Sequence, residues 1–188
     1  MKDCILLRHG ATAMAGLFCG HSDPPLSDAG HQQIDLVASM LRERPDVIYT
    51  SDLKRARQSA ERIASHFGLS VHLRPGLREV NFGAWEGLSW IQIEQRFPAD
   101  AHAWMERYPR GVIPAGEPYE AFRSRVRQEV AFLLAEAKER SLVAVTHGGF
   151  IRTALTELYS FPDSEAYRSS AHYASIVPLP RAQPGGEA

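Results

Sequence analysis

Cysteine is scarce in this sequence: only Cys4 and Cys19 are present, and neither belongs to a CxxC pair. Two thiols cannot build the disulfide framework of a small secreted protein, so we expect a reducing, cytoplasmic setting. Long apolar runs are also absent. The apolar stretch 4–7 is too short for a signal peptide, and no other stretch is long enough to span a bilayer. We therefore expect no membrane partner.

Neither sign of charge dominates, since the 188 residues include 21 basic and 22 acidic side chains. Without a positive field over the whole molecule, we expect no nucleic-acid partner, and an anionic ligand would need a local cluster of arginines. The HExxH motif is missing too, and the eight histidines follow no metal-ligand spacing. The sequence therefore predicts no metal site and no cofactor.

Short apolar segments alternate with segments whose apolar residues recur at helical spacing. We expect strands over 4–7, 47–49, 71–73, 142–145 and 175–177, and helices after the caps Ser27 and Ser51, over 118–138 and after Gly148. Residues 77–116 look less regular. This alternation predicts a single α/β domain over 1–179 with a mostly parallel sheet, followed by a tail, 180–188, that we expect to be disordered.

Two of the predicted strands end in histidine followed by glycine, at His9–Gly10 and at His147–Gly148. In parallel sheets, ligands bind beyond the carboxyl ends of the strands, where glycine lets backbone N–H groups approach an anion. Each motif alone also fits a structural histidine. Together they indicate an anion site at this edge of the sheet.

A third segment opens at the same edge, where Arg55 and Arg57 follow a strand. Residues two apart cannot share a helix face, so one arginine can reach the crevice, and for Arg57 we favour a solvated charge pair. A fourth segment places Glu79 beside the apolar, aromatic and glycine-containing turn 80–87. A carboxyl group in such a place is suited to general acid catalysis.

Four segments, taken in order, resemble the histidine phosphatase superfamily. They are Arg8-His9-Gly10, Ser51-x-Leu53-x-Arg55-Ala56-x-Gln58, Glu79 ahead of Phe82-Gly83-x-Trp85-Glu86, and His147-Gly148. That superfamily contains cofactor-dependent phosphoglycerate mutases and many small phosphatases. The resemblance runs from the first strand to Leu179. It implies a three-layer α/β/α fold of the phosphoglycerate mutase type and hydrolysis of a small-molecule phosphate monoester.

Within the superfamily, the chain looks most like the alpha-ribazole phosphatases of cobalamin synthesis. The supporting segments are 16–21, Trp104 ahead of Pro114-x-Gly116-Glu117, and Phe122-x-x-Arg125-Val126. These shorter matches also recur in broader branches of the superfamily. Alpha-ribazole 5'-phosphate is therefore one candidate substrate.

The resemblance also implies a mechanism. His9 would attack phosphorus and form a phosphohistidine, which water hydrolyses. Glu79 would protonate the leaving oxygen. The phosphoryl oxygens would be matched by donors from Arg8, Arg55 and His147, with backbone N–H groups near Gly10 and Gly148.

By the same resemblance, Thr12, Cys19 and Gly20 belong to the phosphate pocket, although a small buried filler is the other interpretation of Cys19. The chain departs from the family pattern at Ala11, where an acid is usual, and at 13–15, where an asparagine is usual. We expect these departures to affect the geometry of the pocket and its specificity, and not the nucleophile.

Two other functions stay open. A phosphoglycerate mutase would need a longer basic insert than the stretch 88–116, which favours hydrolysis of an ester with an apolar or aromatic leaving group. Trp90, Trp104 and Tyr108 could stack on such a group or simply pack over the helices. A non-catalytic protein that binds phosphorylated ligands is the second alternative. A homodimer is compatible with the sequence.

Overall fold

The computed structural model describes residues 2–41 and 43–180. Within them lies one sheet in the order β3-β2-β4-β1-β5, and all pairs are parallel except that of β1 with β5. Its strands are β1 (Cys4–Arg8), β2 (Val47–Thr50), β3 (Val71–Leu73), β4 (Leu142–Thr146) and β5 (Ile176–Pro178). These match the predicted strands to within a residue at each end. Of the predicted tail, 180–188, residues 181–188 lie outside the described residues.

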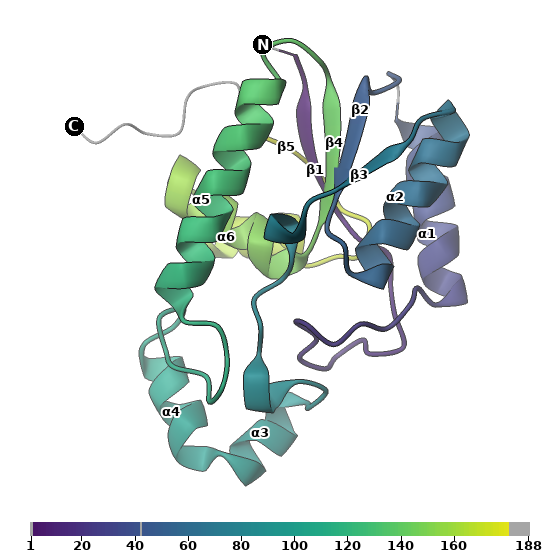
Figure 1. Cartoon of the computed structure of the whole chain (residues 1–188). Helices are drawn as coiled ribbons and strands as arrows, with labels where there is room; N and C mark the ends of the chain where they lie inside the picture. Colours follow the sequence, from purple (N-terminus) through teal and green to yellow (C-terminus); the bar gives the residue numbers. More distant parts are fainter. Residues whose placement is uncertain (1, 42, 181–188) are drawn as a thin grey trace, which may run out of the picture.

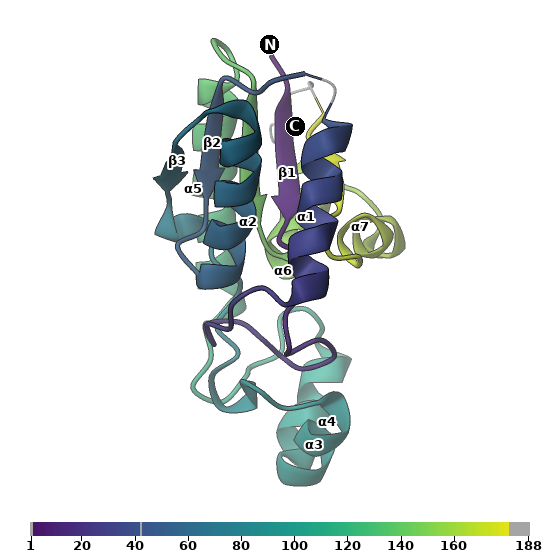
Figure 2. The same ribbon diagram turned by 90° about the vertical axis from the view of Figure 1, so that its right-hand side faces the viewer.

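Helices cover both faces of this sheet (Figures 1 and 2). On one face lie α1 (Asp28–Met40) and α2 (Lys54–Phe67), and on the other α5 (Tyr119–Glu136) and α6 (Gly148–Tyr159), with α7 (Asp163–Ser170) against α6. The three-layer α/β/α architecture expected from the resemblance is thus confirmed.

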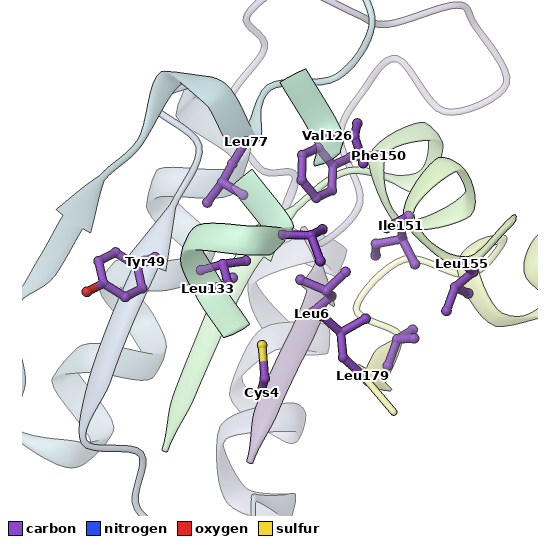
Figure 3. Packing of buried hydrophobic residues seen from close by; sticks show 14 of the residues in the cluster. Cys4, Leu6, Tyr49, Leu77, Val126, Leu133, Phe150, Ile151, Leu155 and Leu179 are labelled. Carbon is purple, nitrogen blue, oxygen red and sulfur yellow. The ribbon is translucent and has the colours of Figure 1, made fainter. Parts of the chain in front are cut away.

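Side chains point alternately to the two faces of the sheet along each strand, and this divides the hydrophobic core into two halves. Leu6 of β1 packs with Val126 and Phe150, which come from α5 and α6, and Figure 3 shows this cluster. Its neighbour Leu7 points the other way and packs with Ile34 of α1. Both faces of β1 are therefore buried, which explains why this strand is an uninterrupted apolar run.

The predicted cap of α1 is confirmed, since the Ser27 side chain accepts a hydrogen bond from the first turn. The predicted cap of α2 is wrong. This helix begins at Lys54 with Leu53 as its N-cap, and Ser51 lies two residues before that cap. The Lys54 N–H instead donates to the carboxylate of Asp23, at 2.6 Å. A side chain from a distant loop therefore supplies the cap, which local sequence signals cannot reveal.

Residues 77–116 are more regular than the sequence indicates. They contain α3 (Trp90–Arg96) and α4 (Pro98–Glu106), which lie beyond the carboxyl ends of the strands (Figures 1 and 2). We call residues 82–113 the helical lobe. Trp85 is fully buried at its centre. The capping box formed by Ser89 and Gln92 is the local signal that predicts α3.

Candidate active site

The two histidine motifs meet because β1 and β4 are parallel neighbours, with Arg8 paired to Thr146. Each strand ends one residue before its histidine. The His9 N–H donates to the Thr146 carbonyl at 3.0 Å, and the ring centroids of His9 and His147 lie 5.0 Å apart. The sheet therefore brings together two histidines that are 138 positions apart (147 minus 9) in the chain.

His9 is held in one tautomer. Its Nδ1 lies 2.7 Å from the Gly10 carbonyl, which can only accept, so Nδ1 carries the proton. Nε2 is then unprotonated and accepts a hydrogen bond from Nε of Arg55 at 3.2 Å. Burial, followed by the charges of Arg55 and Arg8, holds the pKa of His9 well below its ordinary value. His9 is thus a neutral imidazole with its lone pair on Nε2.

Arg55 is fully buried at the start of α2. Apart from His9, its guanidinium donates to three backbone carbonyls of one loop: Ser22 at 2.7 Å, Gly20 at 2.7 Å and Cys19 at 3.1 Å. Within the described residues, no carboxylate oxygen lies within 4.0 Å of this guanidinium. A buried positive charge without a counter-charge is costly unless an anion binds nearby.

Arg8, the residue before His9, also donates to backbone carbonyls. Its Nη1 donates to the carbonyls of Ser170 at 2.9 Å and Ala171 at 2.5 Å, and its guanidinium lies 4.3 Å from the centroid of the Tyr173 ring. Burial lowers the pKa of Arg8. Its Nε has no partner in the described part of the chain. Arg8 therefore has a donor available for a ligand.

His147 is fully buried, and neither of its ring nitrogens has a partner among residues 2–41 and 43–180. Burial, together with the charges of Arg55, His9 and Arg8, holds the pKa of His147 well below its ordinary value. This favours a neutral imidazole that donates one N–H over a protonated ring. An unsatisfied buried donor of this kind is typical of a ligand site.

Glu79 approaches from the loop that leads into the helical lobe and is only 7% exposed. Its Oε1 accepts from the Val80 N–H at 3.0 Å and its Oε2 from the Gly149 N–H at 2.8 Å. A Cβ atom at position 149 would lie 2.3 Å from Oε1 of Glu79. A side chain at 149 would therefore push the Glu79 carboxylate out of its position. Sequence analysis did not single out Gly149, although the pair Gly148–Gly149 was a visible signal.

The two glycines predicted to offer N–H groups to an anion, Gly10 and Gly148, have different roles in the structure. The Gly10 N–H donates to Oγ of Ser59 at 3.1 Å, and a Cβ at position 10 would lie 2.5 Å from the Gly30 carbonyl oxygen. Gly10 therefore allows close packing against α1, and its N–H is not available to an anion as we had expected. At Gly148, a Cβ would lie 3.3 Å from Cζ of Arg8, so this glycine makes room for the arginine.

A cavity of about 380 Å³ opens above these groups, and we call it the catalytic pocket. Six of the ten predicted site residues line it: Arg8, His9, Thr12, Cys19, Glu79 and Gly148. The other four do not line the pocket. Gly10, Arg55 and His147 lie next to His9, and the Gly20 carbonyl accepts a hydrogen bond from Arg55. The wall also contains residues that sequence analysis missed, notably Phe18, Arg152 and Tyr173.

Cys19 and Thr12 have modest roles in this wall. Burial raises the pKa of the Cys19 thiol, which donates weakly to the Ser22 carbonyl at 3.8 Å. The Thr12 hydroxyl accepts from the Met14 N–H at 3.2 Å. Neither Ala11 nor residues 13–15, where the chain departs from the family pattern, line the pocket.

A second cavity, of about 260 Å³, adjoins the catalytic pocket, and we call it the aromatic chamber. The two cavities share Phe18, Phe82, Gly149 and Arg152. Trp104 and Tyr108 line the chamber, whereas Trp90 packs in the core of the helical lobe. Of the three aromatic residues considered for stacking, two are therefore placed where a ligand could reach them.

The described residues contain no group of three or more His, Cys, Asp or Glu side chains arranged to hold a metal ion. None of the described helices is long and apolar enough to cross a membrane.

The comparisons with known proteins agree on one family. Residues 4–187 match the model of the histidine phosphatase superfamily (branch 1). The chain is 31% identical to the adenosylcobalamin/alpha-ribazole phosphatase of Salmonella typhimurium, covering 84% of this chain and 79% of that protein. It is 34% identical to the glucosyl-3-phosphoglycerate phosphatase of Mycobacterium tuberculosis, covering 84% and 75%.

Among solved structures, the alpha-ribazole phosphatase from Shigella flexneri superposes with a TM-score of 0.81 at 25% identity, covering 94% of this chain and 89% of that one. Since the family model spans nearly the whole chain and these relatives cover most of it, the protein belongs to branch 1 of the histidine phosphatase superfamily.

Proposed function

We propose that the protein hydrolyses small-molecule phosphate monoesters through a phosphohistidine formed on Nε2 of His9. It is a phosphoric monoester hydrolase, as its relatives are. The observation that carries the proposed mechanism is the unprotonated Nε2 beside Arg55, with a second unneutralised arginine, Arg8, in the wall of the pocket. A neutral imidazole near two fixed positive charges suits attack on a phosphate dianion.

In the first step, the lone pair of Nε2 of His9 attacks phosphorus, the N–P bond forms and the ester P–O bond breaks. Glu79 gives its proton to the leaving alkoxide. In the second step, Glu79 takes a proton from water, which attacks the phosphoryl group and releases inorganic phosphate and neutral His9. Arg8, Arg55 and the N–H of His147 stabilise the charge on the phosphoryl oxygens in both steps.

The aromatic chamber is the proposed site of the leaving group. Gly149 lies in the walls of both cavities, and its N–H holds the Glu79 carboxylate. An oxygen protonated by Glu79 therefore leaves at the boundary between the pocket and the chamber. The rest of the leaving alcohol can then lie in the adjoining chamber.

The walls of the chamber favour a flat, apolar leaving group. Its aromatic residues include Phe18, Trp104 and Tyr108. Two acidic residues, Glu117 and Asp163, also lie in its walls, and Glu117 is paired with Arg125 at 2.7 Å. Alpha-ribazole 5'-phosphate, suggested by the Salmonella relative, is the first natural substrate to test, and glucosyl-3-phosphoglycerate is the second.

The mechanism is tested by trapping the intermediate. The protein is mixed with p-nitrophenyl phosphate and quenched during turnover in alkaline denaturant, because phosphohistidine is labile in acid. We expect an added phosphoryl mass on the peptide containing His9 and none in His9→Ala, whose kcat should fall by at least about a thousandfold. Turnover without any phosphoryl group on that peptide would refute the mechanism.

The chamber is tested by filling it. Thr156 lines the chamber but not the catalytic pocket. We expect Thr156→Phe to lower kcat/KM for 1-naphthyl phosphate by about tenfold and to leave that for glycerol phosphate within about twofold. Ile91→Ala, at a position 66% exposed on α3, is the control. An equal loss for both substrates would remove the chamber from the proposal.

Three other assays separate the remaining alternatives. Mutase activity on 3-phosphoglycerate that exceeds its hydrolysis would indicate a mutase, and no turnover above that of His9→Ala would indicate a binding protein. We expect EDTA to leave activity unchanged; a full loss restored by a divalent ion would contradict metal independence.

Both cysteines are free thiols, which supports a reducing, cytoplasmic location as a proposal.

A further inference from the structure

Glu86 gathers backbone donors from two separate segments. Its carboxylate accepts from the N–H groups of Gly20 at 3.1 Å, His21 at 2.8 Å, Ser22 at 3.0 Å and Phe82 at 3.0 Å. A carboxylate has about four lone-pair directions, so this set nearly exhausts them. Three of the four donors are consecutive residues, and their N–H groups converge on one side of the loop 19–22.

The carbonyl groups of the same loop point to Arg55. Cys19, Gly20 and Ser22 accept from its guanidinium at 3.1, 2.7 and 2.7 Å. The loop 19–22 therefore lies between a carboxylate on its N–H side and a guanidinium on its carbonyl side. Its peptide dipoles are oriented by both charges, so that Glu86 acts on Arg55 without touching it.

This loop packs closely against its surroundings at Gly20. A Cβ at position 20 would lie 2.1 Å from the Val80 carbonyl oxygen and 2.5 Å from Oε1 of Glu86. The loop also contacts the segment of the proposed general acid, since Nε2 of His21 lies 3.2 Å from the Glu79 carbonyl oxygen. One carboxylate thus fixes the loop relative to both sides of the pocket.

We propose that Glu86 is a positioning residue for phosphoryl transfer: through the loop 19–22, it fixes the Arg55 guanidinium against Nε2 of His9. This inference rests on the proposed function. Glu86 does not line the catalytic pocket, so it acts only through other groups. Without it, the three carbonyls lose their fixed positions, and Arg55 can no longer meet both His9 and a phosphoryl oxygen in one geometry.

The test is a double-mutant cycle with Glu86→Gln and Arg55→Lys. Glutamine keeps the shape of the side chain but turns one acceptor oxygen into a donor that opposes a backbone N–H. We expect Glu86→Gln to raise the Kd for orthovanadate and to lower kcat/KM for p-nitrophenyl phosphate by about tenfold or more. In the Arg55→Lys background, the same substitution should add little, because its effect passes through Arg55.

Two outcomes overturn the proposal: a folded Glu86→Gln protein that matches the wild type, or effects that multiply in the double mutant. Glu129→Gln is the matched control, because Glu129 on α5 is a partly buried carboxylate paired with Arg74, and neither residue lines the catalytic pocket or the aromatic chamber. It should change neither Kd nor kcat/KM. A merely structural role of Glu86 would lower Tm in Glu86→Gln and leave the Kd of the folded protein unchanged.

If Glu86→Gln does not fold, the same cycle is run with Glu86→Asp, which keeps the charge but withdraws it by one methylene. The vanadate arm needs no turnover. A wild-type protein that binds vanadate but forms no phosphohistidine would contradict the proposed mechanism, and the cycle would still report on the coupling between Glu86 and Arg55.

Discussion

His9 is kept as a free base by contacts that only its neutral, Nδ1-protonated form can make. The Gly10 carbonyl fixes the proton on Nδ1, and Arg55 donates to Nε2. Burial then keeps a second proton away. Arg55, which we propose to stabilise the phosphoryl group, therefore also helps to set the protonation state of the proposed nucleophile.

The contact between Gly149 and Glu79 gives a testable prediction for a single residue. We expect Gly149→Ala to lower kcat by about a hundredfold, because its Cβ would displace the Glu79 carboxylate. The loss should be greatest for esters with poor leaving groups, as in Glu79→Gln. Rates measured across a series of aryl and alkyl phosphates check this.

Gly68→Ala is the control for Gly149→Ala. Gly68 has φ of +64° at the end of α2, and a methyl group added there would meet nothing within 4 Å, so alanine costs stability by strain alone. We expect about 1 kcal/mol of destabilisation and an unchanged kcat. A loss in Gly149→Ala that is equal for all leaving groups would argue against the contact with Glu79.

Among the elements, the helical lobe depends on its own small core more than on the sheet. Trp85 is fully buried and lies within 5.7 to 6.3 Å, between ring centroids, of Phe18, Trp90 and Trp104. These rings come from three different parts of the chain. The lobe thereby forms one wall of the aromatic chamber.

We expect Trp85→Ala to lower the free energy of unfolding by about 3–5 kcal/mol, because it leaves a cavity that aromatic neighbours cannot fill. Urea denaturation followed by circular dichroism measures this change. Ile91→Ala on the exposed side of α3 should stay within about 0.5 kcal/mol of the wild type. Equal effects of both substitutions would mean that the lobe is not packed around Trp85.

For the whole molecule, the buried histidines make stability depend on pH. The pKa values of His9 and His147 are lowered well below 6.5 in the folded protein, so the unfolded chain binds more protons below about pH 6.5. Stability is therefore complete above that pH and falls as the pH drops towards the folded pKa values. We expect up to about 1.4 kcal/mol per pH unit for each histidine.

Urea titrations between pH 7.5 and 5 measure this slope. His147→Asn should reduce it, because one of the two buried imidazoles is gone, whereas His102→Asn should not, because His102 is exposed on α4. A slope that both variants leave unchanged would contradict the assignment.

The unneutralised charges of Arg8 and Arg55 predict that an anion stabilises the whole fold. We expect inorganic phosphate at about 100 times its Kd to add about 2.7 kcal/mol to the free energy of unfolding and to raise Tm accordingly. Sodium chloride at equal ionic strength is the control. In Arg55→Ala, the phosphate-dependent rise should shrink; a rise of the wild-type size would place the bound anion elsewhere.

Much of this arrangement could be predicted from the sequence, because it depends on local patterns and on parallel pairing. Apolar runs indicated the strands, and histidine or arginine directly after a strand indicated the edge where ligands bind. His9, Arg55 and His147 accordingly meet in the structure. A short-range pattern was sufficient because parallel strands bring their carboxyl ends to a common edge.

The remaining features depend on contacts between distant segments, for which the sequence carries no local signal. The Gly10 N–H is taken by Ser59, the cap of α2 comes from Asp23, and Glu86 holds a loop some 65 positions earlier in the chain. Each depends on which side chain reaches which backbone group after folding. The sequence by itself determined the reactive groups and the edge where they gather, whereas only tertiary packing decided which donors stay free and what holds Arg55 in place.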